Sequence, residues 1–308
     1  SDYTPKIAIL SAHSSFDASA FSSLLSQNNF EVVTQDLLLE EIDPEAEAAV
    51  LFAPSEDLDE AQLDKLDEFL DNGGQKGKTL LYFASANQPQ LPNLEAFLSE
   101  WGIVMEDATL YETNYSRIYN YSPYYSIVDF VNTEIYEDTS AYLLMPNARV
   151  MDTAYTERDS RTVEVLLKFG STAKALPNDA AEDFDIESAE TYAFPALIQS
   201  TLQKSAGNAN ATGTAMMESH VVVSSSAISC ESSLLNGSTF VNGKYYIALL
   251  NSLLGRESNF SITAKTLDTT TLTMTNFQIL SIGAAFAIII PLVILIVGVV
   301  VWLRRRHK

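Results

Sequence analysis

Short apolar runs and amphipathic stretches alternate along residues 1–110. The apolar runs predict strands at KIAILS (6–11), FEVVTQDL (30–37), AAVLFAP (48–54) and TLLYF (79–83). The amphipathic stretches predict helices within DASAFSSLLSQNN (17–29), LDEAQLDKLDEFLDNGG (58–74) and PNLEAFLSEWG (92–102). Strands that alternate with helices form a parallel sheet covered on both faces. We therefore expect residues 1–110 to form a Rossmann-like, three-layer α/β unit.

The ends of these helices carry recognisable signals. The predicted starts are Asp17, Asp59 in a capping box with Gln62, and Asn93, and the predicted stops are Gly73 with Gly74 and Gly102. The residues expected to face the core are Phe21, Leu24, Leu25, Leu63, Leu66, Leu70, Leu94, Phe97, Leu98 and Trp101.

Residues 111–276 show a less regular pattern and are expected to form the second part of the same domain, which the membrane topology predicted below places outside the cytoplasm. TVEVLLKFG (162–170) and YAFPALIQSTL (192–202) are further short elements, and QKSAGNANATGTA (203–215) is a predicted loop. SHVVVSSSA (219–227) predicts a buried strand, KYYIALLNSLLG (244–255) a helix stopped by Gly255, and NFSITAKTL (259–267) a last strand. The strand at 219–227 needs a neighbouring strand to satisfy its backbone.

The stretch from Ile279 to Leu303 contains no charged residue. As a helix it would span about 37 Å, more than the roughly 30 Å hydrocarbon core of a bilayer. We expect a transmembrane helix over residues 277–303 and a cytoplasmic basic tail over 304–308. Trp302 at interface depth, followed by Arg304, Arg305 and Arg306, predicts a single-pass plasma-membrane protein with an extracytoplasmic bulk and a cytoplasmic C-terminus.

Charge and cysteine content narrow the possible partners. The formal net charge is −22, and the RRRHK tail supplies four of the 18 basic residues, so the acidic remainder would repel nucleic acid. The single cysteine, Cys230, excludes an intramolecular disulfide framework. Five asparagines in N-x-S/T sequons would accept glycans only in a eukaryotic secretory route: Asn114, Asn120, Asn210, Asn236 and Asn259.

Three loops should meet where the parallel strands end, which is where such sheets bind ligands. They are SAHSSFD, APSEDLD and ASANQPQ, and His13, Ser14, Ser85 and Asn87 are the candidate crevice residues. A glutaminase-type site would need a cysteine on a glycine-flanked turn with a histidine to deprotonate it. The turn at 84–86 reads ASA, so we expect no catalytic residue and no cofactor. A hydrolase that uses Ser85 or Cys230 with His13 stays as an alternative.

Metal binding and an aromatic surface are two further kinds of site that the sequence could encode. The three histidines show no metal-ligand spacing, and the 14 carboxylates between Asp36 and Asp71 contain no calcium-loop pattern, so no metal is expected. The tyrosines between 111 and 125 form a candidate aromatic surface that either packs against the domain or stacks on a sugar or peptide: Tyr115, Tyr119, Tyr121 and Tyr124.

The order of these pieces resembles the extracytoplasmic region of GldG-like proteins, the gliding-motility-associated auxiliary subunits of ABC transporters. The resemblance covers nearly the whole chain, from KIAILSAHSS through APSEDLDEAQLDKLDEFLDNGG, PNLEAFLSEWGI, TVEVLLKFGSTAKA, SHVVVSSSA and KYYIALLNSLLG to the membrane exit. It implies a glutaminase-like sheet without the catalytic cysteine, and permease and ATPase subunits as partners. The GHGE-like turn of the family is matched here by Ala12, His13, Ser14 and Ser15, which lack its glycines and its acid.

Two other non-enzymatic classes have a similar outline. One subunit of the eukaryotic oligosaccharyltransferase also combines such a sheet with a single C-terminal membrane helix. A surface solute-binding protein that uses the tyrosines is the other alternative.

Overall fold

A computed structural model describes residues 4–138, 140–203 and 218–256, together with the single positions 278, 280, 284, 286, 291 and 295. The expected strand at 259–267, nearly all of the loop at 203–215, and Trp302 with Arg304–Arg306 lie outside the described residues. So does the expected membrane helix, apart from those single positions. Among the described residues, no helix has the length and apolar character needed to cross a membrane.

An eleven-stranded mixed sheet forms the centre of the molecule. Five parallel strands lie in the order β2 (Glu31–Asp36), β1 (Lys6–Ser11), β3 (Ala48–Phe52), β4 (Thr79–Phe83) and β14 (Glu218–Ser224). Antiparallel strands continue it as β13 (Pro195–Gln203), β11 (Arg161–Lys168), β7 (Ser122–Phe130) and β6 (Ile118–Tyr119), with β10 (Glu157–Arg158) on β11 and β8 (Leu143–Pro146) on β7.

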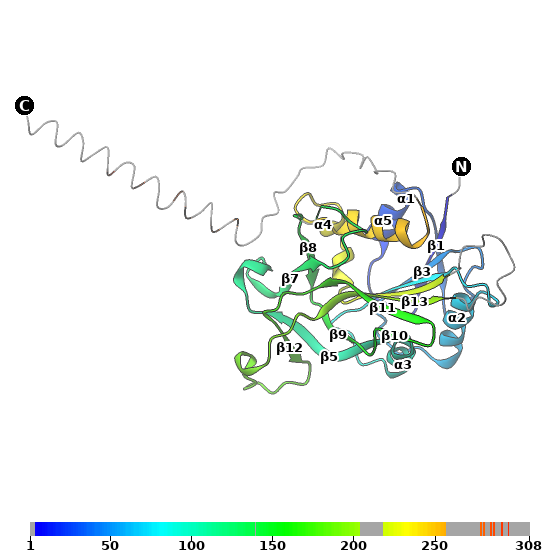
Figure 1. Cartoon of the computed structure of the whole chain (residues 1–308), viewed down its shortest axis with the longest axis horizontal. Helices are drawn as coiled ribbons and strands as arrows, with labels where there is room; N and C mark the ends of the chain where they lie inside the picture. The colour runs from blue at the N-terminus through cyan, green and yellow to red at the C-terminus, as the bar shows by residue number, and fades with distance from the viewer. Residues whose placement is uncertain are drawn as a thin grey trace, which may run out of the picture.

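A smaller antiparallel sheet has the order β12 (Ala173–Pro177), β5 (Ile103–Glu112) and β9 (Arg149–Thr153). It lies beneath the antiparallel half of the large sheet in Figure 1, next to α3. Three short 3-10 turns complete the described elements: η1 (Tyr115–Arg117), η2 (Ile186–Ser188) and η3 (Ile228–Cys230).

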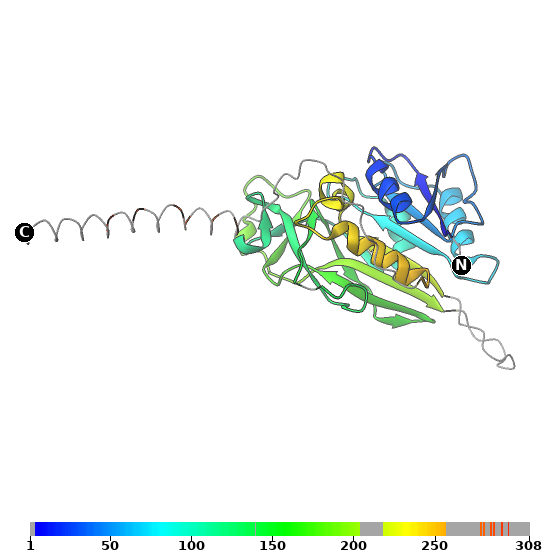
Figure 2. The same ribbon diagram turned by 90° about the horizontal axis from the view of Figure 1, so that it is seen from above.

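Helices cover both faces of the large sheet, as expected for a Rossmann-like α/β fold. Helices α1 (Ser19–Gln27), α4 (Ser232–Leu235) and α5 (Asn242–Leu253) lie on one face, and α2 (Glu60–Asp71) and α3 (Pro92–Glu100) lie on the other (Figure 1). Seen from above, α5 lies over the middle of the sheet, between α1 and the antiparallel strands (Figure 2). The fold is therefore a mixed α/β structure of three layers.

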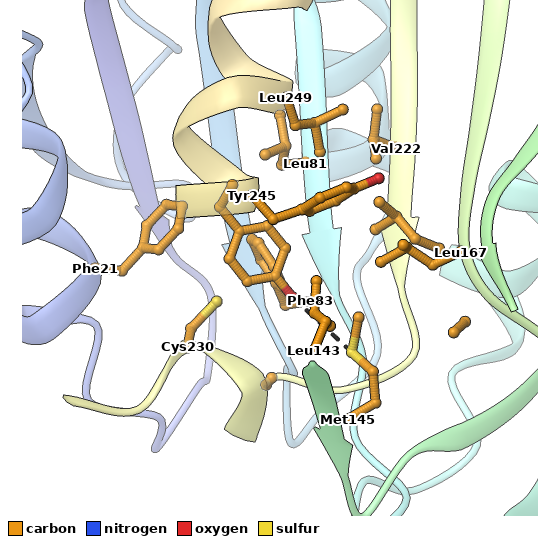
Figure 3. Close-up of a cluster of buried hydrophobic side chains, with 14 of the residues drawn as sticks. Phe21, Leu81, Phe83, Leu143, Met145, Leu167, Val222, Cys230, Tyr245 and Leu249 are labelled. Atoms are coloured by element: carbon orange, nitrogen blue, oxygen red, sulfur yellow. Dashed lines mark hydrogen bonds between the residues drawn. The ribbon is translucent and has the colours of Figure 1, made fainter. Parts of the chain in front are cut away.

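The larger of the two main apolar clusters lies under α5. Tyr245 and Leu249 project from α5 toward Phe83 of β4 and Val222 of β14, and Phe21 of α1 closes the cluster (Figure 3). Phe83 stacks on Phe52 at 4.9 Å between ring centroids. The cluster joins residues from both halves of the chain, so each half buries the apolar surface of the other.

The expected strand at 219–227 is confirmed as β14, and it holds the central position. It pairs in parallel with β4 and antiparallel with β13, so both edges of its backbone are satisfied. Val221 and Val223 face the α2 side, and Val222 faces the α5 side. The first and second parts of the chain therefore share one continuous sheet.

The predicted end of α3 is confirmed, but its predicted start is wrong. Gly102 has a φ of +79°, the left-handed conformation that a helix stop requires. The helix begins with Pro92 at its first position, which fixes φ for helix entry, and Leu91 is its N-cap. Asn93 lies inside the first turn, and the carboxylate of Asp57 from another loop accepts its backbone N–H at 2.8 Å.

Of the other predicted helix ends, one is confirmed and two are shifted by a residue. The capping box of Asp59 and Gln62 is present. The C-cap of α2 is Asn72, at a φ of +51°, one residue before the predicted Gly73, because asparagine also tolerates this conformation. Gly73 and Gly74 are left-handed as predicted, at +60° and +79°. Asp17 lies one residue before the Ala18 N-cap of α1, and its side chain accepts the Ser19 N–H at 2.9 Å.

Candidate functional site

Four loops meet at one edge of the parallel sheet. Because β1, β3, β4 and β14 run in the same direction, the segments that follow them emerge at the same edge. His13 and Ser14 follow β1, Ser85 and Asn87 follow β4, and the sequence SSAISC follows β14. The strand-end corner anticipated from the sequence is therefore a real feature of the fold.

His13 lies on the outer side of this corner. Its backbone is left-handed, with a φ of +51°, and its carbonyl accepts the N–H of Ser55 at 3.0 Å. The imidazole Nδ1 lies 3.5 Å from an oxygen of Glu56. The neighbouring Ser14 hydroxyl accepts the N–H of Phe16 at 3.1 Å. These contacts fix the turn after β1 and leave the imidazole at the surface.

The turn after β4 is closed by its own hydrogen bonds. The Ser85 hydroxyl accepts the N–H of Asn87 at 3.2 Å, and the Ser85 N–H donates to the Gln88 side chain at 2.8 Å. Gln88 in turn donates to the Tyr82 hydroxyl at 2.7 Å. Strand β3 lies between β1 and β4. Within the described residues, no hydrogen bond or ion pair joins His13 to Ser85.

A buried arginine that the sequence analysis did not single out supports this turn from below. Arg149 is 1% exposed. Its guanidinium donates to the carbonyl of Glu106 at 2.8 Å and to the carboxylate of Glu95 at 2.7 Å, and it reaches the Pro89 carbonyl at 3.4 Å. One sequence signal could have identified Arg149: it is the only charged residue in the apolar run LLMPNARVM. A buried arginine needs hydrogen-bond acceptors such as these carbonyls and this carboxylate.

Cys230 is buried beneath the same edge of the sheet. It is 0% exposed and lies in the apolar cluster of Figure 3. Burial raises the pKa of its thiol well above the usual value. The Ser229 hydroxyl lies 4.0 Å from its sulfur, at the limit of a weak hydrogen bond. A thiol that stays protonated and covered is not an activated nucleophile.

The candidate tyrosines separate into packed and exposed residues. Tyr119 packs edge-on against Phe240 at 5.1 Å, and Tyr124 packs against Tyr111 at 5.6 Å, both measured between ring centroids. Tyr115 and Tyr121 lie 5.9 Å apart and are 43% and 55% exposed. Tyr119 and Tyr124 are therefore engaged with other rings, whereas Tyr115 and Tyr121 form an exposed pair.

Within residues 4–138, 140–203 and 218–256, no group of three or more histidine, cysteine, aspartate or glutamate side chains could hold a metal ion. In chemical terms the corner offers one exposed imidazole beside a carboxylate, a serine whose hydroxyl already accepts a local amide, and polar loop surface. This arrangement can bind a partner by hydrogen bonds, but it lacks a paired nucleophile and base.

No protein-family model matches the chain, and no curated protein matches its sequence. Among solved structures, the mmIFT52 N-terminal domain is similar, with 16% sequence identity, coverage of 80% of this chain and 97% of that chain, and a TM-score of 0.55. This likeness shows the fold alone.

Two further structures resemble the chain more weakly. A glutamine amidotransferase from Thermotoga maritima has 10% identity, coverage of 82% and 99%, and a TM-score of 0.40. A putative GMP synthase subunit from Thermoplasma acidophilum has 9% identity, coverage of 82% and 94%, and a TM-score of 0.37. These structural neighbours are of the glutamine amidotransferase type, and at such scores they carry no argument about function.

Proposed function

We propose that the chain is a non-enzymatic auxiliary subunit of an ABC transporter, related to the GldG-like proteins. Its α/β domain would contact a permease, a transported substance or a surface partner. The observation that supports this proposal is the closed turn after β4. An amidotransferase-type enzyme would need its nucleophile there, and this chain has Ser85 with its hydroxyl turned to Asn87.

The other candidate reactive side chains at the corner, His13 and Cys230, also support a non-enzymatic role. Nucleophilic catalysis requires a base within hydrogen-bond reach of the nucleophile. His13 pairs with Glu56, and Cys230 is enclosed by apolar side chains. A fold of this kind can carry either an enzyme or a binding domain, so the site must decide between them. Here the site favours binding.

The proposal includes the membrane anchor expected at residues 277–303. The domain would lie outside the plasma membrane and the basic tail inside, with the permease and the ATPase as partners.

The test is to extract the full-length protein from its own membranes with a mild detergent and to identify by mass spectrometry what stays attached. We expect a permease and a nucleotide-binding subunit. A chain without residues 277–308 is the control, and it should release the permease if the anchor contributes to assembly. Repeated recovery of the full chain without either subunit would contradict the proposal.

The oligosaccharyltransferase subunit with one C-terminal membrane helix is the second candidate, and the exposure of two sequons favours it. Asn120 and Asn236 are exposed, whereas Asn114 is half-buried with its side-chain oxygen accepting from Ser116. Under this alternative, native protein should lose mass at Asn120 and Asn236 on enzymatic glycan removal. Unmodified asparagines at both positions would argue against it.

A further inference from the structure

A cavity of about 370 Å³ opens beside β7, in the antiparallel half of the large sheet. Strands β14, β13 and β11 separate it from β4, so it is distinct from the strand-end corner. Arg117, Ile127, Asp129, Phe130 and Tyr142 contribute to its walls. Its volume lies within the range of small-molecule sites, roughly 300–1,000 Å³.

Arg117 is held in one position at this cavity. Its Nη2 group donates to the Ile127 carbonyl at 2.9 Å and lies 3.0 Å from an oxygen of Asp129. The backbone of Gly170 passes so close that a Cβ there would collide with the guanidinium. The side chain is therefore preorganised, which lowers the entropy cost of binding a ligand.

The charges at the cavity do not favour an anion. Arg117 and Asp129 form an ion pair, and a second carboxylate, Glu112, has a fully buried side chain 3.7 Å from the Arg117 Nε. Within the described ranges, no hydrogen bond involves Nη1 of Arg117 or the second oxygen of Asp129, so Nη1 can still donate and that oxygen can still accept. The buried Nε of Arg117 also has no hydrogen-bond partner there. The net charge of −22 on the whole chain also disfavours an anionic ligand.

Aromatic surface lies beside these polar groups. Tyr142 is 41% exposed, and Phe130 is partly buried on the adjoining strand. An aromatic ring next to a fixed donor and acceptor matches the two sides of a sugar, whose C–H face is apolar and whose hydroxyl groups donate and accept.

We propose that this cavity binds a neutral saccharide. A sugar hydroxyl pair can accept from Arg117 and donate to Asp129 while the ion pair between them stays intact. The two charged groups of a zwitterionic amino acid would have to compete with that ion pair. The proposal is independent of the transporter assignment, because saccharide binding requires neither permease nor ATPase.

The experiment uses the full chain in phosphatidylcholine nanodiscs, which avoids detergents with sugar head groups. Glucose, galactose, mannose, N-acetylglucosamine and their short oligomers are titrated by calorimetry and by saturation-transfer NMR, with glycine and alanine as zwitterionic probes. We expect saturable binding of at least one neutral saccharide and no binding of the amino acids.

Two variants locate the binding. Tyr142→Ala removes an exposed ring and should weaken affinity about tenfold. Asp129→Asn removes the acceptor charge and should weaken it by a similar factor. Tyr192→Ala is the matched control, because Tyr192 is 52% exposed and does not line the cavity. A thermal melt of each variant checks that it is folded.

Three results would overturn the proposal. They are the absence of saturable binding of any saccharide up to about 10 mM, binding of amino acids in place of saccharides, and saccharide binding that Tyr142→Ala and Asp129→Asn leave unchanged. A permease found in the membrane extraction would not alter any of them, so the two proposals fail separately.

Discussion

Three titratable side chains of this domain have pKa values that burial shifts. Cys230, Tyr246 and His220 all have a pKa moved toward the neutral form, and burial is the first cause in each case. Desolvation disfavours the charged form of any group. These three side chains therefore stay uncharged at neutral pH.

The first prediction at this scale concerns Cys230. Because its thiol is fully buried and its pKa is raised, a water-soluble disulfide reagent should not modify the folded protein. In guanidinium chloride the same reagent should titrate one thiol per chain. Rapid modification under native conditions would contradict the burial and reopen the alternative of a cysteine nucleophile.

The second prediction concerns His220, whose Nδ1 lies 3.0 Å from the Thr201 hydroxyl. Burial lowers its pKa from 6.5 to about 4. Between pH 4 and pH 6.5 the unfolded chain therefore binds more protons at His220 than the folded chain. The contribution of neutral His220 to the free energy of unfolding is complete above pH 6.5 and is lost as the pH falls toward 4. We expect a loss of up to ~3 kcal/mol.

Urea unfolding at pH 7.5, 5.5 and 4.5 measures this contribution. Carboxylates also titrate in the lower part of the range, so the informative quantity is the difference between the parent chain and His220→Gln. The variant should show a shallower decline in unfolding free energy with acidity. Equal slopes would show that His220 is not the group responsible.

At the scale of elements, loops far apart in the sequence are held by single polar side chains. Asp57 accepts two N–H groups at the start of α3 from the loop after β3, and Arg149 links the turn after β4, helix α3 and strand β5. A buried arginine satisfied by carbonyls and one carboxylate fixes the positions of all three. The rigidity of the strand-end corner therefore depends on Arg149.

We predict that Arg149→Met destabilises the domain by ~2–4 kcal/mol, because it removes the guanidinium from two carbonyls and leaves the Glu95 carboxylate with only the Leu91 N–H as a donor. The free energy of unfolding from urea titrations measures the loss. Arg158→Met is the matched control, since the Arg158 side chain is 57% exposed and its removal should cost less than ~0.5 kcal/mol. Similar losses in the two variants would show that burial of Arg149 is not what matters.

The elements were more predictable than the contacts between them. The periodicity of the sequence located β1, α2 and β14 closely, and the pair Asp59 and Gln62 identified a capping box that is present. Asn93 was misassigned because the carboxylate that accepts its N–H, that of Asp57, comes from another loop. The role of Arg149 was missed for the same reason, since its partners are distant in sequence and a local pattern cannot contain them.

At the scale of the whole molecule, the sheet joins the two parts of the chain. Strand β14 lies between β4 and β13, and Val221 and Val223 complete the cluster that α2 and α3 cover. Residues 1–110 supply the parallel strands β1 to β4 but leave β4 as an open, apolar edge. The domain is thus one folding unit rather than two.

We predict that residues 1–110 expressed alone do not fold stably. Without β14, β4 keeps β3 but loses its second parallel partner, and the cluster under α5 loses Tyr245 and Leu249. Thermal melts followed by circular dichroism, and the dispersion of amide proton shifts in NMR spectra, show whether the fragment is folded. Adding residues 111–256 in the same chain should restore one cooperative transition seen by both probes. A fragment that melts cooperatively by itself would contradict the prediction.

The late position of β14 in the sequence also affects how the protein is made. One edge of β4 pairs with β3, but the other edge can pair with β14 only after residues 84–217 have been synthesised, which takes about ten to thirty seconds at the usual elongation rates. During that time the nascent chain presents an uncovered row of Leu80, Leu81, Tyr82 and Phe83. A bound holdase, or synthesis coupled directly to export, would protect that row from pairing with other chains.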